Sequence, residues 1–315
     1  MNDARVTPGA SAAAGSSSAP GSPSTSLPRI LRARGHSLAW GPGTVPLLMA
    51  IVNATPDSFS DGGLHADAAS AIDFGERCIA DGAAIVDIGG ESTRPGAQRV
   101  DAAEQIARTC PVVEALARRA PVSIDTTRAA VAQAALAAGA CMVNDVSAAT
   151  DDPAIIDAAC SAGAALVLMH RLHAPAEDRV STEADPRRRY GDVVRDVRDW
   201  LGARIEAAVH AGLPRECIAV DPGLGFGKDV AQNMELLVRV GEFASLGVPV
   251  LVGASRKSFL GAVAGEPDAA RRDAASIVAA LEAASNGAAI LRVHDVHGHR
   301  VALAAWVAVR AAKAR

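Results

Sequence analysis

Eight short apolar runs of this 315-residue chain end in polar or charged side chains, and one group of these side chains suits an anion. Cationic groups together with uncharged hydrogen-bond donors are what a phosphate or a diphosphate requires. The candidates for this role are Asn53, Thr93, Arg94, Arg256, Lys257, Arg292 and His294. The sequence therefore predicts an anion site assembled from the ends of several runs.

A second group suits a flat heterocycle that carries several N–H donors. Asp125, Asn144 and Asp221 also end apolar runs. An aspartate accepts two parallel hydrogen bonds, and an asparagine both donates and accepts. Together the two groups imply a ligand with a polar ring at one end and a phosphorylated arm at the other. A structural ion pair is the alternative for Asp125 and Asp221.

The apolar runs themselves are near-continuous and rich in β-branched residues, which is typical of strands buried on both faces. They cover residues 47–53, 84–90, 122–125, 141–146, 165–170, 218–221, 250–255 and 289–294. Alanine-rich stretches lie between them and carry helix signals, such as Asp101 with Glu104, Asp152 before Pro153, and Gly139 as a stop. Eight such units predict an α/β fold, a single (β/α)8 TIM barrel, in preference to an open doubly wound sheet.

The barrel prediction explains why the polar residues matter as a set. The carboxyl ends of all eight strands of such a barrel meet at one face. Side chains that are far apart in the sequence are therefore expected to surround one opening.

The first part of the chain has a different composition. Residues 8–26 consist only of Pro, Gly, Ala, Ser and Thr, which is too little apolar surface to offset the entropy of ordering. We expect residues 1–36 to form a disordered tail and residues 37–315 to form the barrel domain. The tail is either idle or an arm that binds a partner.

Composition excludes several classes of function. The net charge is −4 and aromatic residues make up 3% of the chain, so neither a nucleic acid nor an anionic membrane is expected as a partner. No apolar run approaches the roughly 18 residues of a membrane span, and the first thirty residues contain no signal core. The five cysteines are scattered and form no CxxC pair, which predicts reduced thiols in the cytoplasm.

Other common motifs are incomplete. Residues 223–228 resemble a phosphate loop but lack its spacing and the hydroxyl residue after Lys228. No nucleophile elbow occurs. His297 and His299 have no acidic or cysteine partners at zinc spacing.

Six blocks, in order along residues 46–310, resemble the signatures of the dihydropteroate synthase family. They are IVNATPDSFSDGG (51–63), DIGGESTRPG (87–96), NDVS (144–147), DPGLGFGK (221–228), GASRKS (253–258) and RVHDV (292–296). Six ordered motifs make this resemblance far more specific than any single glycine loop.

The resemblance implies a transferase of folate biosynthesis. Such an enzyme condenses a dihydropterin methyl diphosphate with 4-aminobenzoate and releases dihydropteroate and diphosphate. Mg2+ is the implied cofactor, because it binds substrate phosphates and assists their departure. The family also implies a homodimer through the seventh and eighth barrel helices, and inhibition by sulfonamides, which mimic aminobenzoate.

The resemblance also assigns roles to individual residues. Pterin binding falls to Asp125, Asn144, Met169, Asp221 and Lys257, and diphosphate binding to Asn53, Thr93, Arg94, Arg292 and His294. Asn53 supplies the oxygen for the metal. The aminobenzoate pocket is assigned to Phe59, Pro95, Phe226, Ser255 and Arg256. Catalysis is assigned to Asp125, Lys257, Arg292 and His294, with Asp125 stabilising positive charge on the ring.

Two alternatives stay open. A methyltetrahydrofolate–corrinoid methyltransferase would share the acidic pterin pocket, but it would not need the diphosphate residues Thr93, Arg94, Lys257, Arg292 and His294. A non-catalytic paralogue would bind pterin without turnover and act through a partner.

Overall fold

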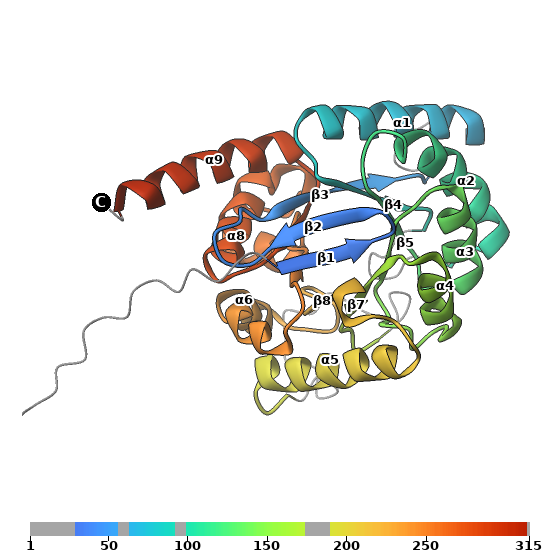
Figure 1. Ribbon diagram of the computed structural model, residues 1–315. Coiled ribbons are helices and arrows are strands. Elements are labelled where there is room, and N and C mark those ends of the chain that lie inside the picture. Colours follow the sequence, from blue (N-terminus) through green and yellow to red (C-terminus); the bar gives the residue numbers. More distant parts are fainter. Residues whose placement is uncertain (1–28, 56–62, 92–98, 174–189, 314–315) are drawn as a thin grey trace, which may run out of the picture.

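The computed structural model describes residues 29–55, 63–91, 99–173 and 190–313. Eight parallel strands form a nearly closed barrel, in the order β8-β7-β6-β5-β4-β3-β10-β9, and helices surround it (Figure 1). A bridge between Val220 and Val250 joins the two ends of the sheet. The predicted TIM barrel is therefore confirmed.

The strands lie within the predicted runs. Their bounds are β3 (Leu47–Asn53), β4 (Ile85–Gly89), β5 (Val122–Asp125), β6 (Met142–Asp145), β7 (Ala165–Met169), β8 (Ile218–Asp221), β9 (Leu251–Val252) and β10 (Ile290–Val293). The helices of the described residues are α1 (Gly63–Ala80), α2 (Ala102–Leu116), α3 (Ala129–Ala138), α4 (Ala154–Ala162), α5 (Val193–His210), α6 (Val230–Val238), α7 (Ser258–Ala264), α8 (Asp273–Ser285) and α9 (Val296–Lys313). Three short 3-10 turns lie at Arg215–Cys217, Val240–Leu246 and Ala269–Arg271.

Local signals in the sequence set several helix ends. The Asp101 side chain accepts a hydrogen bond from the backbone of Glu104 at the start of α2. Asp152 accepts one from the backbone of Ala154, but α4 begins one residue later than predicted, with Pro153 at the N-cap. Gly139 ends α3 with a positive φ of 120°. These caps were predicted because side-chain oxygens satisfy the first N–H groups of a helix and glycine tolerates the conformation that ends one.

An antiparallel hairpin precedes the barrel and corrects the predicted tail boundary. Strands β1 (Arg29–Ala33) and β2 (His36–Trp40) pair around a turn at Arg34 and Gly35, both with positive φ. Leu31 is 1% exposed and packs with residues of the barrel interior. The tail prediction is therefore wrong for residues 29–36, because their burial depends on distant residues. Residues 1–28 lie outside the described part of the chain.

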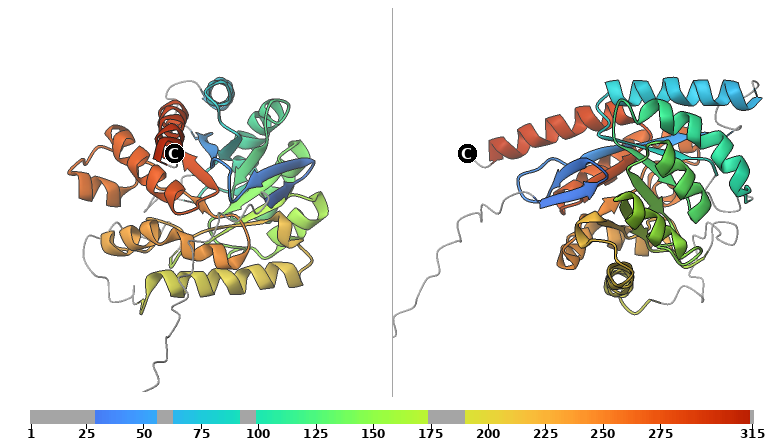
Figure 2. Two further views of the ribbon diagram at one scale, coloured as in Figure 1. Left: turned by 60° about the vertical axis from the view of Figure 1, so that its left-hand side comes forward. Right: turned by 45° about the vertical axis from the view of Figure 1, so that its right-hand side comes forward.

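The barrel interior is apolar at one end and polar at the other. The apolar end holds side chains from several strands together with those of the hairpin, and these are Leu31, Ala33, Met49, Ile85, Met142, Ala165, Ala219 and Leu251. Figure 2 shows the hairpin at the end of the barrel where α9 also terminates. The opposite end, where the strands have their carboxyl termini, is thus the open one.

Among the described residues, none of the helices combines the length and the apolar character that crossing a membrane would need.

Candidate functional site

Strand register brings the predicted polar residues together at the open end of the barrel. Asn53 pairs with Gly89, Gly89 with Asp125, and Asp125 with Asn144, so one row crosses β3 to β6. On the far side, β7 and β8 end together because Met169 pairs with Asp221. Residues separated widely along the chain therefore line one opening, as the barrel prediction required.

The centre of this opening is a buried cluster of charge around Arg292. Its Nε donates to Oδ2 of Asp87 and one terminal nitrogen, NH2, donates to Oδ2 of Asp125, each at 2.7 Å. The Asn144 amide also donates to Asp87 Oδ2, at 3.0 Å. Asp87 is fully buried and Asp125 is 6% exposed. One arginine thus joins strands β4, β5 and β10.

The cluster is incomplete within the described residues. The second carboxylate oxygens, Oδ1 of Asp87 and Oδ1 of Asp125, are buried with no hydrogen-bond partner among those residues. The other terminal nitrogen of Arg292, NH1, likewise has no hydrogen bond to any of them. Buried polar groups without partners cost free energy, so these atoms are candidate contacts for a ligand.

The orientation of Asn144 follows from its neighbour. A carboxylate only accepts hydrogen bonds, so the amide nitrogen of Asn144 must face Asp87. Asp87 therefore fixes the amide of Asn144 with its nitrogen toward Asp87 and leaves its oxygen as a hydrogen-bond acceptor.

Burial shifts the titration of the two central carboxyl groups. It raises the pKa of Asp125 from 3.8 to about 7, while Arg292 acts against the shift and Asp87 adds to it. Burial also raises the pKa of Asp221, and Lys257 acts against that shift. Carboxyl groups with raised pKa values in a cleft are typical of functional sites.

A second wall is formed by the segment that follows β8. The backbone N–H of Gly223 donates to Asp221 Oδ1 at 2.7 Å. Lys257, which precedes α7, donates to the carbonyl of Leu224, and its Nζ lies 4.3 Å from the centre of the Phe226 ring. Lys257 thus lies over the aromatic face of Phe226 and acts electrostatically on the buried Asp221 carboxylate.

Ser255 and His294 form a pair on the neighbouring wall. Ser255 Oγ lies 2.9 Å from His294 Nδ1 and accepts the backbone N–H of His294 at 3.2 Å. This pairing fixes the orientation of the imidazole ring and directs Nε2 away from Ser255. His294 directly follows β10, the strand that carries Arg292, and its role in an anion site stays a prediction.

Arg256 is oriented differently from its neighbours. Its guanidinium forms two hydrogen bonds with Asp273 at the start of α8, at 2.7 and 2.8 Å, and its φ is +58°. The assignment of its side chain to the aminobenzoate pocket stays a prediction. Four further assigned residues lie outside the described part of the chain, namely Phe59, Thr93, Arg94 and Pro95.

Asn53 offers an amide oxygen at the end of β3, half-buried at the opening. The described residues contain no cluster of three or more His, Cys, Asp or Glu side chains that could hold a metal by themselves. Mg2+ keeps several waters and is often held by one or two protein oxygens plus substrate phosphates. A single amide oxygen facing a phosphate site fits that donor set.

Three residues organise the site although the sequence assigned none of them a specific role: Asp87 and His170, which were expected at the strand ends, and Lys228, which was not. All three are buried and form polar contacts with site residues or with their backbone. A carboxylate inside the otherwise apolar run of β4 was the available signal for Asp87. His170 and Lys228 were assigned no role because their contact depends on the fold of two different loops.

The sequence of this chain is similar to those of one family of known proteins. Residues 49–294 match the profile of a family described as pterin binding enzyme. The dihydropteroate synthase of Synechocystis sp. is 43% identical over 85% of this chain and 92% of its own length.

Solved structures agree in fold and sequence. A dihydropteroate synthase of Xanthomonas albilineans with 4-aminobenzoic acid has a TM-score of 0.81 and 42% identity, covering 90% of this chain and 99% of that chain. A dihydropteroate synthase of Burkholderia cenocepacia complexed with 7,8-dihydropteroate has a TM-score of 0.79 and 44% identity, covering 92% and 99%.

Proposed function

The chain belongs to the dihydropteroate synthase family of transferases, and from this we propose that it joins a dihydropterin methyl diphosphate to 4-aminobenzoate. The products are dihydropteroate and diphosphate. One observation carries the proposal: a buried set of hydrogen-bond acceptors lies beside a set of cations at the same opening.

The acceptors suit the pterin ring. Asp125 Oδ1 is buried without a partner among the described residues, and Asp221 and Asn144 use their other polar atoms, Oδ1 and the amide nitrogen, in the hydrogen bonds described above. A pterin presents an amino group and ring N–H groups along one edge, which need acceptors. Met169, buried at the end of β7, supplies apolar contact to the ring.

The cations suit the diphosphate. Arg292, His294 and Lys257 lie at the opening beside the acceptors. The charges of Arg292 and Lys257 and a hydrogen bond from His294 stabilise the leaving group as its own negative charge grows. Mg2+, held by Asn53 and the substrate phosphates, would supply further charge neutralisation.

The reaction needs no covalent nucleophile from the protein. The bond between the methylene carbon and the diphosphate oxygen breaks, and the electron pair leaves with diphosphate. The amine nitrogen of 4-aminobenzoate then bonds to the methylene and loses a proton. Asp125 stabilises the positive charge that develops on the conjugated ring, because a buried carboxylate acts strongly at short range.

A homodimer is part of the proposal. Val278 on α8 is 69% exposed, and Val301 and Val309 on α9 are 49% and 56% exposed. Figure 1 shows the C-terminal half of α9 projecting beyond the barrel. Apolar side chains gathered on two adjacent helices are typical of an interface. Light scattering of the wild type and of Val278→Glu tests this, and a monomeric wild type would refute it.

The first experiment is a turnover assay with purified protein, Mg2+, the pterin diphosphate and 4-aminobenzoate, with and without a sulfonamide. Diphosphate release that depends on aminobenzoate and is inhibited by the drug is the expected result. Binding of the pterin diphosphate without turnover would favour the non-catalytic paralogue. Methyl transfer from methyltetrahydrofolate to a corrinoid would favour the related methyltransferase.

A further inference from the structure

The turn that carries Phe226 is packed too closely to tolerate side chains at its glycines. Three alternate residues have positive φ, at 69°, 80° and 67°, and these are Gly223, Gly225 and Gly227. A Cβ atom on the first would lie 1.9 Å from the carbonyl oxygen of His170. A Cβ atom on the second would lie 2.8 Å from Cδ of Lys257. The turn is thus shaped by contacts on both sides.

Lys228 fills the inside of this turn. Its Nζ donates to the carbonyl of Gly223 at 2.9 Å and to that of Phe226 at 3.1 Å. It also lies 3.1 Å from Nδ1 and 3.4 Å from the carbonyl oxygen of His170. The residue is 5% exposed. A buried ammonium group needs several acceptors, and the turn folds around it to supply them.

His170 enters this arrangement as a neutral acceptor. Burial and the nearby Lys228 lower the pKa of His170 to about 2. The ring packs edge-on against Trp200 at 4.9 Å between centroids. Since Lys228 donates to Nδ1, the ring proton sits on Nε2.

We propose that Lys228 is a positioning residue for the reaction, which holds the 223–228 turn so that Asp221, Phe226 and Lys257 face one opening. The proposal rests on the proposed function. Lys228 acts through these residues and is not assigned a contact with either substrate. Lys257 donates to the carbonyl of Leu224, which lies in the turn between the two carbonyls that Lys228 holds. A change in the turn therefore also moves Lys257.

The charge of Lys228 supplies a second effect. The charged groups that face Asp221 are Lys257, Lys228 and Arg292, and each opposes the effect of burial on the pKa of Asp221. His170, the titratable group at the end of β7, is neutral. Removing the Lys228 charge should therefore raise the pKa of Asp221 further, since less positive charge stabilises the carboxylate.

Two variants separate charge from shape. Lys228→Gln keeps donors for the turn carbonyls and removes the charge, whereas Lys228→Arg keeps the charge. The measurement is kcat/KM for the pterin diphosphate across the acid and neutral pH range, at saturating 4-aminobenzoate. Lys313→Met, at the exposed end of α9, is the control for loss of a lysine charge, and thermal unfolding confirms that each variant folds.

We expect Lys228→Gln to raise KM for the pterin substrate roughly tenfold. The acid limb, which is the fall in kcat/KM at low pH as Asp221 is protonated, should move to a pH about one unit higher. Lys228→Arg should keep the wild-type acid limb. An unchanged limb in Lys228→Gln, or equal changes in both variants, would overturn the proposal. Absence of turnover in the wild type would instead refute the proposed function.

If Lys228→Gln fails to fold, His170→Gln tests the same contact. It keeps the lysine charge and should leave the acid limb unchanged while raising KM, and an unchanged KM would also overturn the proposal.

Discussion

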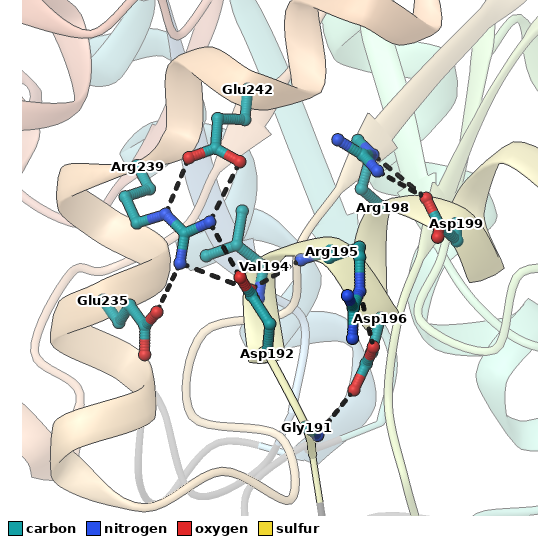
Figure 3. A network of polar contacts seen from close by, with 10 residues as sticks. All are labelled: Gly191, Asp192, Val194, Arg195, Asp196, Arg198, Asp199, Glu235, Arg239 and Glu242. Atoms are coloured by element: carbon teal, nitrogen blue, oxygen red, sulfur yellow. Dashed lines mark hydrogen bonds and ion pairs between the residues drawn. The ribbon is translucent and has the colours of Figure 1, made fainter.

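Arg239 on the outer surface and Arg292 in the barrel opening each hold more than one carboxylate, but only one of the two clusters is complete. Arg239 uses all three of its nitrogens on Asp192, Glu235 and Glu242, which joins the ends of α5 and α6 to the 3-10 turn at Val240–Leu246 (Figure 3). Both oxygens of Glu242 and both of Asp192 have partners.

The Arg292 cluster differs from the Arg239 cluster in two ways: it is more deeply buried, and some of its carboxylate oxygens have no hydrogen-bond partner in the part of the chain that the structure describes. Asp87 and Asp125 each offer Arg292 one oxygen and leave the other buried and unpaired within the described residues. The exposed cluster also lowers the pKa values of Asp192 and Glu242, chiefly through hydrogen bonds, whereas burial raises that of Asp125. The Arg239 cluster therefore pairs most of its charges internally, whereas the Arg292 cluster leaves two buried carboxylate oxygens without partners among the described residues.

The largest expected effect comes from removing Arg292. Arg292→Met leaves two buried carboxylates without their cation, so the free energy of unfolding should fall by about 3–5 kcal/mol. kcat/KM for the pterin substrate should fall roughly 1000-fold or more. Denaturant unfolding and steady-state kinetics measure both, and wild-type kinetics in this variant would remove Arg292 from the site.

A smaller effect is expected from Asp87, which orients Asn144 and Arg292. Asp87→Asn weakens two charge-assisted hydrogen bonds, so KM for the pterin substrate should rise roughly 10- to 100-fold. KM for 4-aminobenzoate should change little. Asp192→Asn, in the surface cluster, is the matched control and should leave both constants unchanged. A variant that affects aminobenzoate alone would contradict the orientation role.

The pH dependence of stability provides a third comparison. The pKa of Asp125 is raised from 3.8 to about 7, so between these values the folded protein holds a proton that the unfolded chain has released. The free energy of unfolding should therefore decrease as the pH rises through this window. Asp125→Asn should flatten that dependence. An identical pH profile of unfolding in the variant and the wild type would show that Asp125 titrates normally.

The smallest effect is expected from Arg239. Arg239→Met breaks half-buried ion pairs at the surface, which water still screens, so the unfolding temperature should fall by less than about 3 °C. Turnover should match the wild type. The same substitution is thus expected to abolish most of the activity at Arg292 and none of it at Arg239. A loss of activity in Arg239→Met would show that the two clusters do not differ in function.

Periodicity and local chemistry in the sequence determined most of the fold. The eight apolar runs became the eight barrel strands, and Asp101 and Gly139 bound helices as expected. These features depend on neighbours within a few residues, so they are readable in one dimension. The polar strand ends also followed, because parallel strands in a barrel place their carboxyl ends at one face.

Tertiary structure alone decided how the polar side chains pair. Arg292 contacts Asp87 and Asp125 across 205 and 167 residues of chain. Arg256 pairs instead with Asp273 at the start of α8. The burial of Leu31 and the contact of Lys228 with His170 are also long-range. The sequence by itself determined which groups reach the opening. The tertiary structure decides which of these groups hydrogen-bond to one another and which are left without a partner, because the distances and the burial arise only when the barrel closes.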